Sequence, residues 1–346
     1  MKKGFGSDNH SGTHPELLKA IVTCNGGHEP SYGTDQYSLL AAKDFKNHFG
    51  PQTESYFVFN GTAANVLALR FLCDRHESVF CSSISHVNLD EGGAPELLAG
   101  KLIPLPHSEG KISLQTLQEH FVRRGDQHYS QSRVVTLTQP TELGTCYSRD
   151  EIKSICDWAH SNGLFVHIDG ARLTNALVHL DCTFKEMTTD CGVDVVSFGG
   201  TKNGLMMGEA VLVLNPSLSS SAKQKMKYLR KQITQLPSKT RFISAQFHRY
   251  FSDGLYLQIA KHSCRMAQLL QEGLAQNTAV QITAAVQSNA VFAVLPKEIV
   301  KPLKEKFFFY VWDEKTFECR IMTSWDTTEA EVQEFIHELQ LLTAKK

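Results

Sequence analysis

Two apolar stretches of the chain each lead into a charged side chain of a reactive type. LFVHIDG (164–170) ends with Asp169 and a glycine, and SFGGTKNG (197–204) places Lys202 just behind an apolar run. Both runs have the length and composition of buried strands. Ligands of open parallel sheets bind at the carboxyl ends of the strands. A carboxylate and an amine at two such ends are therefore candidates for chemistry on a bound molecule.

A third strand end adds a place for phosphate. Gly61 and Thr62 lie where YFVFNG (56–61) passes into a helical pattern, and free N–H groups at a helix start attract anions. A lysine, an aspartate and a phosphate cradle at one sheet edge describe a site for pyridoxal phosphate. The lysine would form a Schiff base, and the aspartate would keep the pyridine nitrogen protonated, so that the ring draws electrons. Singly, these residues read as a turn aspartate, a loop lysine and an ordinary helix start; together and in this order they are far more specific.

The elements that must position these residues alternate along the chain. Strand patterns at 56–61, 133–140, 164–170 and 193–200 are separated by helical patterns, including ANVLALRFL (63–71). Ser148 and Glu151 form a capping box that opens a further helix. Strand, helix and strand at short intervals predict right-handed crossovers and a mostly parallel sheet covered on both faces. We therefore expect an α/β large domain.

The chain changes character after about Pro237. A long helical pattern (roughly 240–275) precedes several strand-like segments, among them FFFY (307–310), and a helix from about Thr328. This order favours a small α+β lobe. We expect a large domain over residues 1–236 and a small C-terminal domain over 237–346.

Composition excludes several classes of function. The 346 residues carry a net charge of −1 without clusters of Lys and Arg, so no nucleic-acid partner is expected. No apolar run approaches the roughly 18 residues of a membrane helix, and MKKGFGSDNHSG lacks the apolar core of a secretory signal. The nine cysteines contain no C-x-x-C pair, so free thiols in the cytoplasm are expected and no metal site is. His167 is expected to pack inside its strand.

Several segments that surround these candidate residues resemble those of a known enzyme family. Nearly end to end, the chain contains in this order the segments FGSDNHSGTHPELLKAI, PSYGTDQYS, FNGTAANVLAL, SSISHVNLDEGGAPE, TQPTELGTCYS, HIDGARLTNA, SFGGTKNG and RIMTSWDTT. The chain resembles the threonine aldolases of the β-eliminating-lyase group. These belong to the aspartate-aminotransferase-like (fold type I) enzymes that use pyridoxal phosphate. The resemblance implies that fold and that cofactor.

The resemblance also implies roles for individual residues. Three would be catalytic, namely Lys202, His86 and Asp169, and His86 would also stack on the cofactor ring. Further contacts to the cofactor would come from Gly61, Thr62, Arg172 and Arg241. The substrate would be held by Ser7, Arg172, Arg320 and His128. Thr201 and Asn203 depart from the S-K-G form that many relatives carry around the lysine, which leaves the local hydrogen bonding open.

The implied activity is cleavage of L-threonine or L-allo-threonine into glycine and an aldehyde. The base that takes the β-hydroxyl proton is open between His86 and a water that His86 orients. One alternative keeps the cofactor but breaks another bond, by β-elimination, transamination or racemisation. Another is a protein of this fold retained for binding or regulation. The resemblance also implies a homo-oligomer, a tetramer or dimer, with active sites shared between subunits.

Overall fold

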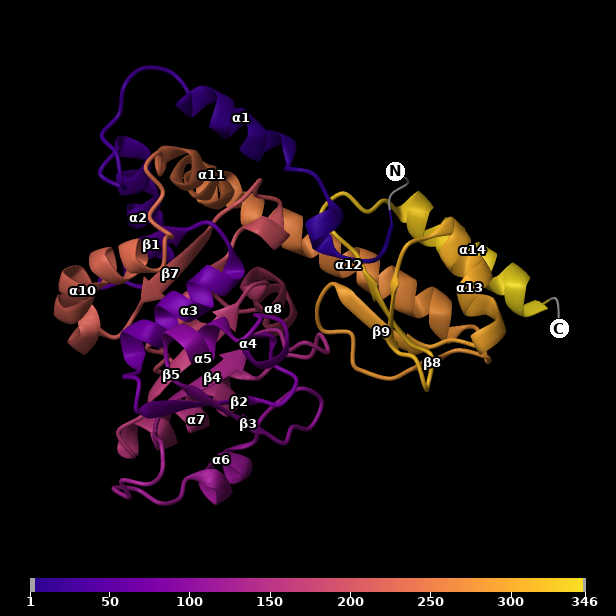
Figure 1. Cartoon of the computed structure of the whole chain (residues 1–346). Coiled ribbons are helices and arrows are strands. Elements are labelled where there is room, and N and C mark those ends of the chain that lie inside the picture. Colours follow the sequence, from indigo (N-terminus) through magenta and orange to yellow (C-terminus); the bar gives the residue numbers. More distant parts are fainter. Residues whose placement is uncertain (1–3, 345–346) are drawn as a thin grey trace.

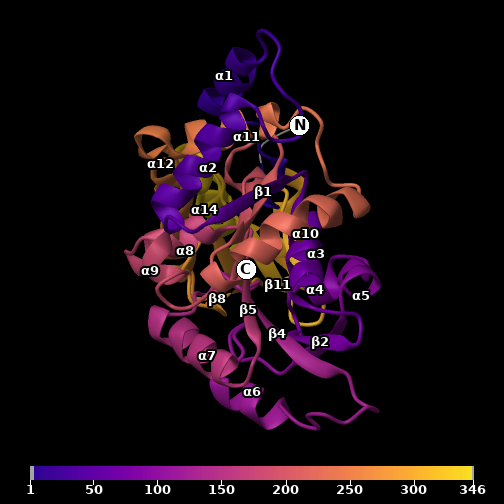
Figure 2. The same ribbon diagram turned by 90° about the vertical axis from the view of Figure 1, so that its left-hand side faces the viewer.

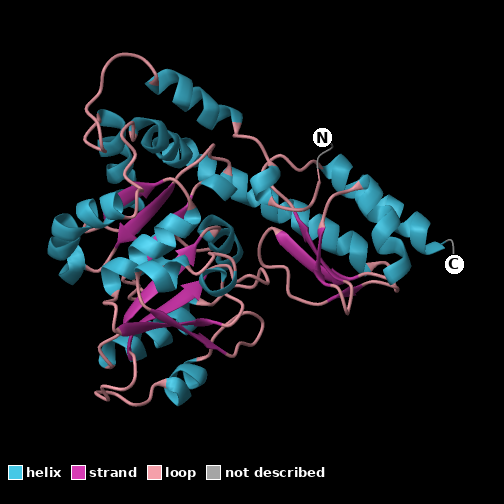
Figure 3. Cartoon of the chain, viewed as in Figure 1, coloured by secondary structure: helices cyan, strands magenta, loops and turns pink. Residues whose placement is uncertain are grey.

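The protein, in a computed structural model that describes residues 4–344, has two lobes (Figure 1). The larger lobe surrounds one long sheet, and the smaller lobe packs three helices on a second sheet (Figure 3). The first three and the last two residues, where the two expected domains begin and end, lie outside the described range. No helix within residues 4–344 is long and apolar enough to cross a membrane.

The large sheet has seven strands in the order β1-β7-β6-β5-β4-β2-β3. Neighbours from β6 to β3 run parallel, whereas β7 is antiparallel to both β1 and β6. The mostly parallel α/β sheet expected from the sequence is thus confirmed. Its strands are β1 (Glu54–Val58), β2 (Glu77–Ser82), β3 (Lys101–Leu105), β4 (Gln131–Thr138), β5 (Phe165–Gly170), β6 (Val195–Gly199) and β7 (Glu209–Val213).

Alternate residues of these strands enter two separate cores. Val135 and Val196 belong to the core on one face, and Val134 and Val195 belong to the core on the other. Figure 2 shows α7, α8 and α9 on one side of the sheet and α3, α5 and α10 on the other. The helices of this lobe are α1 (Pro15–Cys24), α2 (Gln36–Phe49), α3 (Gly61–Leu72), α4 (His86–Leu89), α5 (Ala94–Leu98), α6 (Leu114–His120), α7 (Arg149–Ser161), α8 (Leu173–Leu180), α9 (Phe184–Met187), α10 (Ser219–Gln232) and α11 (Arg241–Phe251).

The small lobe begins along a single long helix. The helical pattern at 240–275 is broken at Asp253 and Gly254, both of which have positive φ, and then continues as α12 (Leu255–Ala275). Within α12, Ile259 still packs in the core of the large lobe and Met266 in the core of the small lobe, so the boundary between the two cores lies within α12, after residue 236. The remaining elements are β8 (Gln281–Ile282), β9 (Ala290–Val294), α13 (Lys297–Lys306), β10 (Tyr310–Asp313), β11 (Glu318–Met322) and α14 (Glu329–Ala344).

The four small-lobe strands form an antiparallel sheet in the order β10-β11-β9-β8. Strand β10 begins at Tyr310, so most of FFFY precedes it, with Phe307 and Phe309 buried in the core. Phe5, from the opposite end of the chain, belongs to the same core. Its N–H donates to the Phe308 carbonyl (2.7 Å) and its carbonyl accepts from the Met322 N–H (2.8 Å). The amino-terminal segment is therefore part of the small lobe before it turns toward the large one.

Candidate active site

A cavity of about 470 Å³ lies at the carboxyl ends of the parallel strands, and both lobes contribute to its wall. A smaller cavity of about 280 Å³ adjoins it and shares Asp169, Lys202 and His86 with it. The predicted residues that line one or both cavities are Ser7, Gly61, Thr62, His86, Asp169, Arg172, Lys202 and Arg320. Residues far apart in the sequence are thus gathered at the sheet edge where the strand-end argument placed them.

Asp169 is the buried carboxylate of the site. It ends β5, is 5% exposed, and accepts hydrogen bonds from the Asn65 side-chain amide (2.8 Å) and the Ala171 N–H (3.1 Å). Both bonds fix the orientation of the carboxyl group. Asn65 comes from α3, whose first residues also border the smaller cavity. The aspartate and the helix start are therefore held at a fixed distance from each other.

A chain of polar contacts links His86 to Asp169. His86 Nδ1 lies 2.8 Å from Glu91 Oε1, and the same Asn65 nitrogen that bonds Asp169 also donates to Glu91 Oε1 (2.7 Å). The hydrogen bond to Glu91 raises the pKa of His86, while burial raises the pKa of Glu91. His86, Glu91 and Asp169 place potential metal ligands within 4.8 Å of one another, but these atoms are already joined through one another and Asn65. The expectation of no metal stays a prediction.

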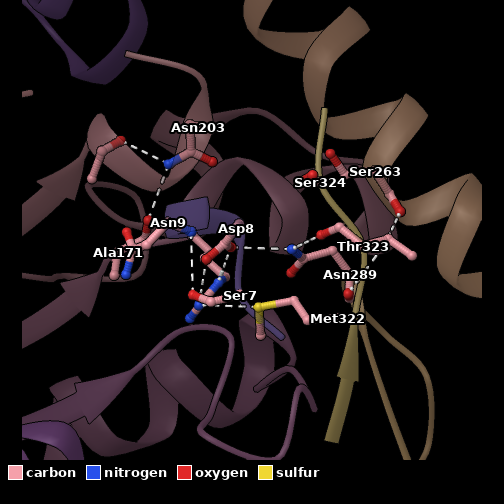
Figure 4. A network of polar contacts seen from close by, with 12 residues as sticks. Ser7, Asp8, Asn9, Ala171, Asn203, Ser263, Asn289, Met322, Thr323 and Ser324 are labelled. Atoms are coloured by element: carbon pink, nitrogen blue, oxygen red, sulfur yellow. Dashed lines mark hydrogen bonds and ion pairs between the residues drawn. The ribbon is translucent and has the colours of Figure 1, made fainter. Parts of the chain in front are cut away.

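Lys202 lies in a single tight turn, residues Thr201–Asn203, directly after β6. The Asn203 side-chain amide donates to the carbonyls of Ala171 (3.0 Å) and Gly199 (2.9 Å) (Figure 4), and Thr201 Oγ1 accepts from the Gly208 N–H (3.2 Å). The two flanking residues that left the local bonding open thus fasten the turn to both neighbouring segments. Gly199 is required there, because a Cβ would lie 2.1 Å from the Ala171 carbonyl oxygen.

The electrostatic surroundings of Lys202 favour its neutral form. The positive charge of Arg172, followed by burial, lowers the pKa of the Lys202 amine. Only a neutral amine has the free electron pair that attacks a carbonyl carbon. The position of Arg172 therefore makes Lys202 more reactive toward an aldehyde than a solvated lysine would be.

Behind the lysine turn lies a buried glutamate that the sequence did not single out. Glu209 accepts hydrogen bonds from the Gly200 and Thr201 N–H groups, the second at 3.4 Å. Burial raises the pKa of Glu209 to about 7. Its carboxyl group fixes the backbone that carries Lys202, at the cost of burying an ionisable group.

Replacing Glu209 by glutamine should flatten the pH dependence of stability in the cofactor-free protein. The folded pKa lies above the usual value of 4.5, so the stability that this group provides is full below about pH 4.5 and is lost as pH rises to about 7. That loss is roughly 3 kcal/mol in the wild type and absent from the variant. Urea unfolding across this pH range measures it. Glu119→Gln, at an exposed position of α6, is the control. Parallel curves of unfolding free energy against pH for Glu209→Gln and wild type would refute the prediction.

The two arginines that are predicted to bind the substrate differ in how many of their N–H groups are already bonded. The Arg172 Nε and Nη2 atoms donate to the two oxygens of buried Asp8 (2.5 and 2.8 Å). Burial opposes ionisation of Asp8, but the charge of Arg172 holds its pKa below the usual value. Asn289 from the small lobe also donates to Asp8 (3.1 Å) (Figure 4). This edge of the Arg172 fork is thus occupied, and the role of both arginines in holding a substrate carboxylate stays a prediction.

Arg320 lies on β11 with its guanidinium over the rings of Tyr310 and Trp312, at 5.3 and 5.1 Å from the ring centres. Its Nη2 donates to the Gly6 carbonyl (3.3 Å), and among the described residues no carboxylate pairs with it. Burial lowers the pKa of Arg320, yet an arginine stays charged in proteins. Ser7 lines the same cavity and caps the next turn, its Oγ accepting from the Asn9 N–H (3.2 Å).

The smaller cavity has the features of an anion site. It is lined by Gly61 and Thr62, the first residues of α3, together with Thr201 and Lys202. The Asn60 side chain caps the helix through the Ala63 N–H (2.9 Å), which leaves the earlier N–H groups for a ligand. A Cβ on Gly61 would meet nothing within 4 Å, so this position faces open space. These features fit the phosphate of pyridoxal phosphate.

Two predicted residues line neither cavity in this chain. Arg241 starts α11, and its guanidinium lies 3.4 Å from the Gly26 and Gly27 carbonyls. His128 lies in the exposed loop before β4, where its N–H donates to Asp126 (2.9 Å). The cavities lie at the other end of β4, so the role of His128 beside a substrate stays a prediction. His167 packs as expected, bonded to Thr136 (2.8 Å) and Ser197 (2.9 Å).

The fold and the cavity define the class of protein, an α/β enzyme with the aminotransferase-like architecture. An aromatic aminotransferase from Pyrococcus horikoshii has the same fold at 15% identity (TM-score 0.70, 99% of this chain and 94% of that one). Residues 4–297 match the model of the β-eliminating lyases, and the chain belongs to that family.

Individual relatives match this chain over nearly its full length. A low specificity L-threonine aldolase from a Pseudomonas strain is 41% identical over 97% of this chain and 96% of its own length. The enzyme of the same name from Pseudomonas aeruginosa is 40% identical over 98% and 97%. The structure of the threonine aldolase from Leishmania major matches with a TM-score of 0.92, at 27% identity and 99% coverage of both chains.

Proposed function

We propose that this chain binds pyridoxal phosphate and cleaves L-threonine or L-allo-threonine to glycine and an aldehyde. One observation carries the proposal: Lys202, Asp169 and the start of α3 surround one continuous site at the end of the parallel strands. The Pseudomonas relatives named for this activity support the choice of reaction. Bound there, the cofactor supplies an electron-withdrawing ring that stabilises negative charge on the substrate Cα.

The chain's own residues would divide the work. Lys202 would hold the cofactor's aldehyde carbon, Asp169 its pyridine nitrogen, and the N–H groups of Gly61 and Thr62 its phosphate. His86, beside the same cavity, would pack against the ring. Arg320 and Ser7 would orient the substrate carboxylate, because a charged, planar guanidinium can bond two oxygens at once. A fixed carboxylate sets which bond at Cα is broken, and so favours the Cα–Cβ bond over the Cα–H bond.

Incubation with L-threonine provides the direct test. The protein supplied with pyridoxal phosphate should release acetaldehyde and glycine in equal amounts, measured with alcohol dehydrogenase and by chromatography of the amino acid. Ammonia with a keto acid would instead assign the β-elimination alternative. An amino acid and a keto acid in exchange would assign transamination. Either outcome would overturn the proposed cleavage.

We also propose that the chain works as a homo-oligomer, a tetramer or dimer, in the cytoplasm. Phe59 and Met207 both line the smaller cavity, yet they are 40% and 44% exposed. Apolar side chains exposed beside a site are typical of a surface that another subunit covers. The nine cysteines are free, and all but Cys182 are buried, as in a protein of a reducing compartment.

A further inference from the structure

Glu142 brings a partly unused carboxyl group to the main cavity. It follows β4 and lines the cavity together with Lys202 and Arg320. Its Oε1 accepts hydrogen bonds from the His86 N–H (2.8 Å) and the Thr138 hydroxyl (2.9 Å). Its Oε2 is buried and has no hydrogen-bond partner within residues 4–344. A buried carboxyl oxygen without a partner is costly and calls for an explanation.

The protonation state of this carboxyl group is balanced near neutrality. Burial raises the pKa of Glu142 to about 7, against the hydrogen bonds that it accepts from the His86 N–H and the Thr138 hydroxyl. The titratable and charged groups that interact with it are Asp169, His86, Arg172, Cys81 and Tyr147. Of these, Asp169 raises the pKa further. A carboxyl group with this pKa can both take and return a proton at neutral pH.

The other acidic side chains of the cavity are already engaged or exposed. Asp169 accepts from Asn65 and Ala171. Asp90 also lines the cavity but is an exposed residue. The Nδ1 atom of His86 is tied to Glu91, and that bond raises the histidine pKa, so more of the ring is protonated and unable to act as a base. Glu142 is therefore the acidic residue of the cavity wall that has a buried carboxyl oxygen without a partner among residues 4–344.

We propose that Glu142 is the catalytic base that takes the β-hydroxyl proton of the substrate, an inference that rests on the proposed cleavage reaction. As the O–H bond breaks, its electron pair becomes the second C–O bond of the aldehyde. The Cα–Cβ bond breaks at the same time, and its pair stays with Cα of the glycine half. That half takes up one proton at Cα from solvent, and Glu142 releases one to solvent. The products therefore have the same atoms and charge as the substrate.

The variant Glu142→Gln separates proton transfer from structural support. The glutamine Oε1 can still accept from the His86 N–H and the Thr138 hydroxyl, so the loop should stay in place, but the amide cannot take a proton. We expect kcat for threonine cleavage to fall about 10²- to 10⁴-fold. Exchange of the glycine α-proton with D₂O, which needs no hydroxyl proton transfer, should change only a few-fold. Glu119→Gln removes an exposed carboxylate of α6 that lines neither cavity, and it should leave both rates within a few-fold of wild type.

Each other outcome has a distinct meaning. Cleavage by the glutamine variant at the wild-type rate would overturn the role of Glu142 as a base. Equal losses in cleavage and in glycine exchange would overturn it in favour of a positioning role. If the wild type exchanges the glycine α-proton but does not cleave threonine, the proposed function itself fails, and the wild type alone reveals this.

A second measurement does not depend on turnover. In protein labelled with ¹³C at the glutamate carboxyl groups, the resonance absent from the Glu142→Gln spectrum belongs to Glu142. It should titrate near neutral pH. Titration at the ordinary glutamate value of about 4.3 would overturn the proposal even if the variant were inactive.

Discussion

Replacing Lys202 by alanine should reduce threonine cleavage by at least about 10³-fold, because the variant lacks the amine that would react with the cofactor aldehyde. Lys202 lines both parts of the site, and no other lysine of residues 4–344 lines either cavity. The variant should also lose the visible absorption that distinguishes pyridoxal phosphate bound to a lysine from the free cofactor. Acetaldehyde release and the absorption spectrum measure the two effects.

A matched control variant keeps the positive charge but removes the nucleophilic amine. Lys202→Arg retains a cation at the same turn but cannot attack a carbonyl carbon, since its guanidinium stays protonated. It should be as inactive as the alanine variant. Circular dichroism should show that both variants are folded, because the turn is held by Asn203, Thr201 and Glu209 rather than by the lysine. Activity in either variant would refute the assignment of Lys202.

Replacing Asp169 by asparagine should reduce kcat by at least about 10²-fold, because a neutral amide cannot stabilise a protonated pyridine nitrogen as a carboxylate does. The amide has nearly the same shape, so the cofactor should still bind, with a weaker affinity that absorbance titration can measure. The amide must also share its single oxygen between the Asn65 amide and the Ala171 N–H. We therefore expect a loss of about 1–2 kcal/mol in the free energy of unfolding.

Asp157→Asn provides the control for this prediction, since Asp157 is an exposed residue of α7 paired with Lys153 (2.9 Å). It should leave kcat unchanged. An Asp169→Asn variant with the kcat of the wild type would show that the ring nitrogen needs no negative partner. Loss of cofactor binding alone, with full activity at saturating cofactor, would contradict the prediction equally.

The residues that the sequence could predict lie where a backbone pattern ends. Asp169, Lys202 and Gly61 follow from strand periodicity and from the rule that parallel strands present their carboxyl ends to one edge. The seven-stranded sheet confirms that rule for this chain. Three of its strands, β2, β3 and β7, were not predicted individually, since short apolar runs do not distinguish a buried strand from a buried helix.

The residues that the sequence could not predict owe their roles to partners distant in the chain. Asn65, Glu91 and Glu142 gain theirs from contacts to Asp169 and His86, which only the folded sheet brings close. The same holds for Asp8, whose pairing with Arg172 spans more than 160 residues. The residues next to these side chains in the sequence do not indicate which distant residue each of them will contact. His128 precedes β4 and lies at the amino end of that strand in its own chain, so its role beside a substrate stays a prediction.

The amino-terminal segment has a consequence for how the enzyme is made. Phe5 is synthesised about 300 residues before its backbone partners Phe308 and Met322. The α/β core of the large lobe can fold during translation, whereas Ser7 and Asp8 reach the substrate pocket only once the last strand exists. A nascent chain stalled before residue 308 would therefore hold a folded sheet with Lys202 in its turn and an unfinished substrate pocket. Catalytic competence should thus depend on a late step, in which residues 5–8 dock on the segments around Phe308 and Met322.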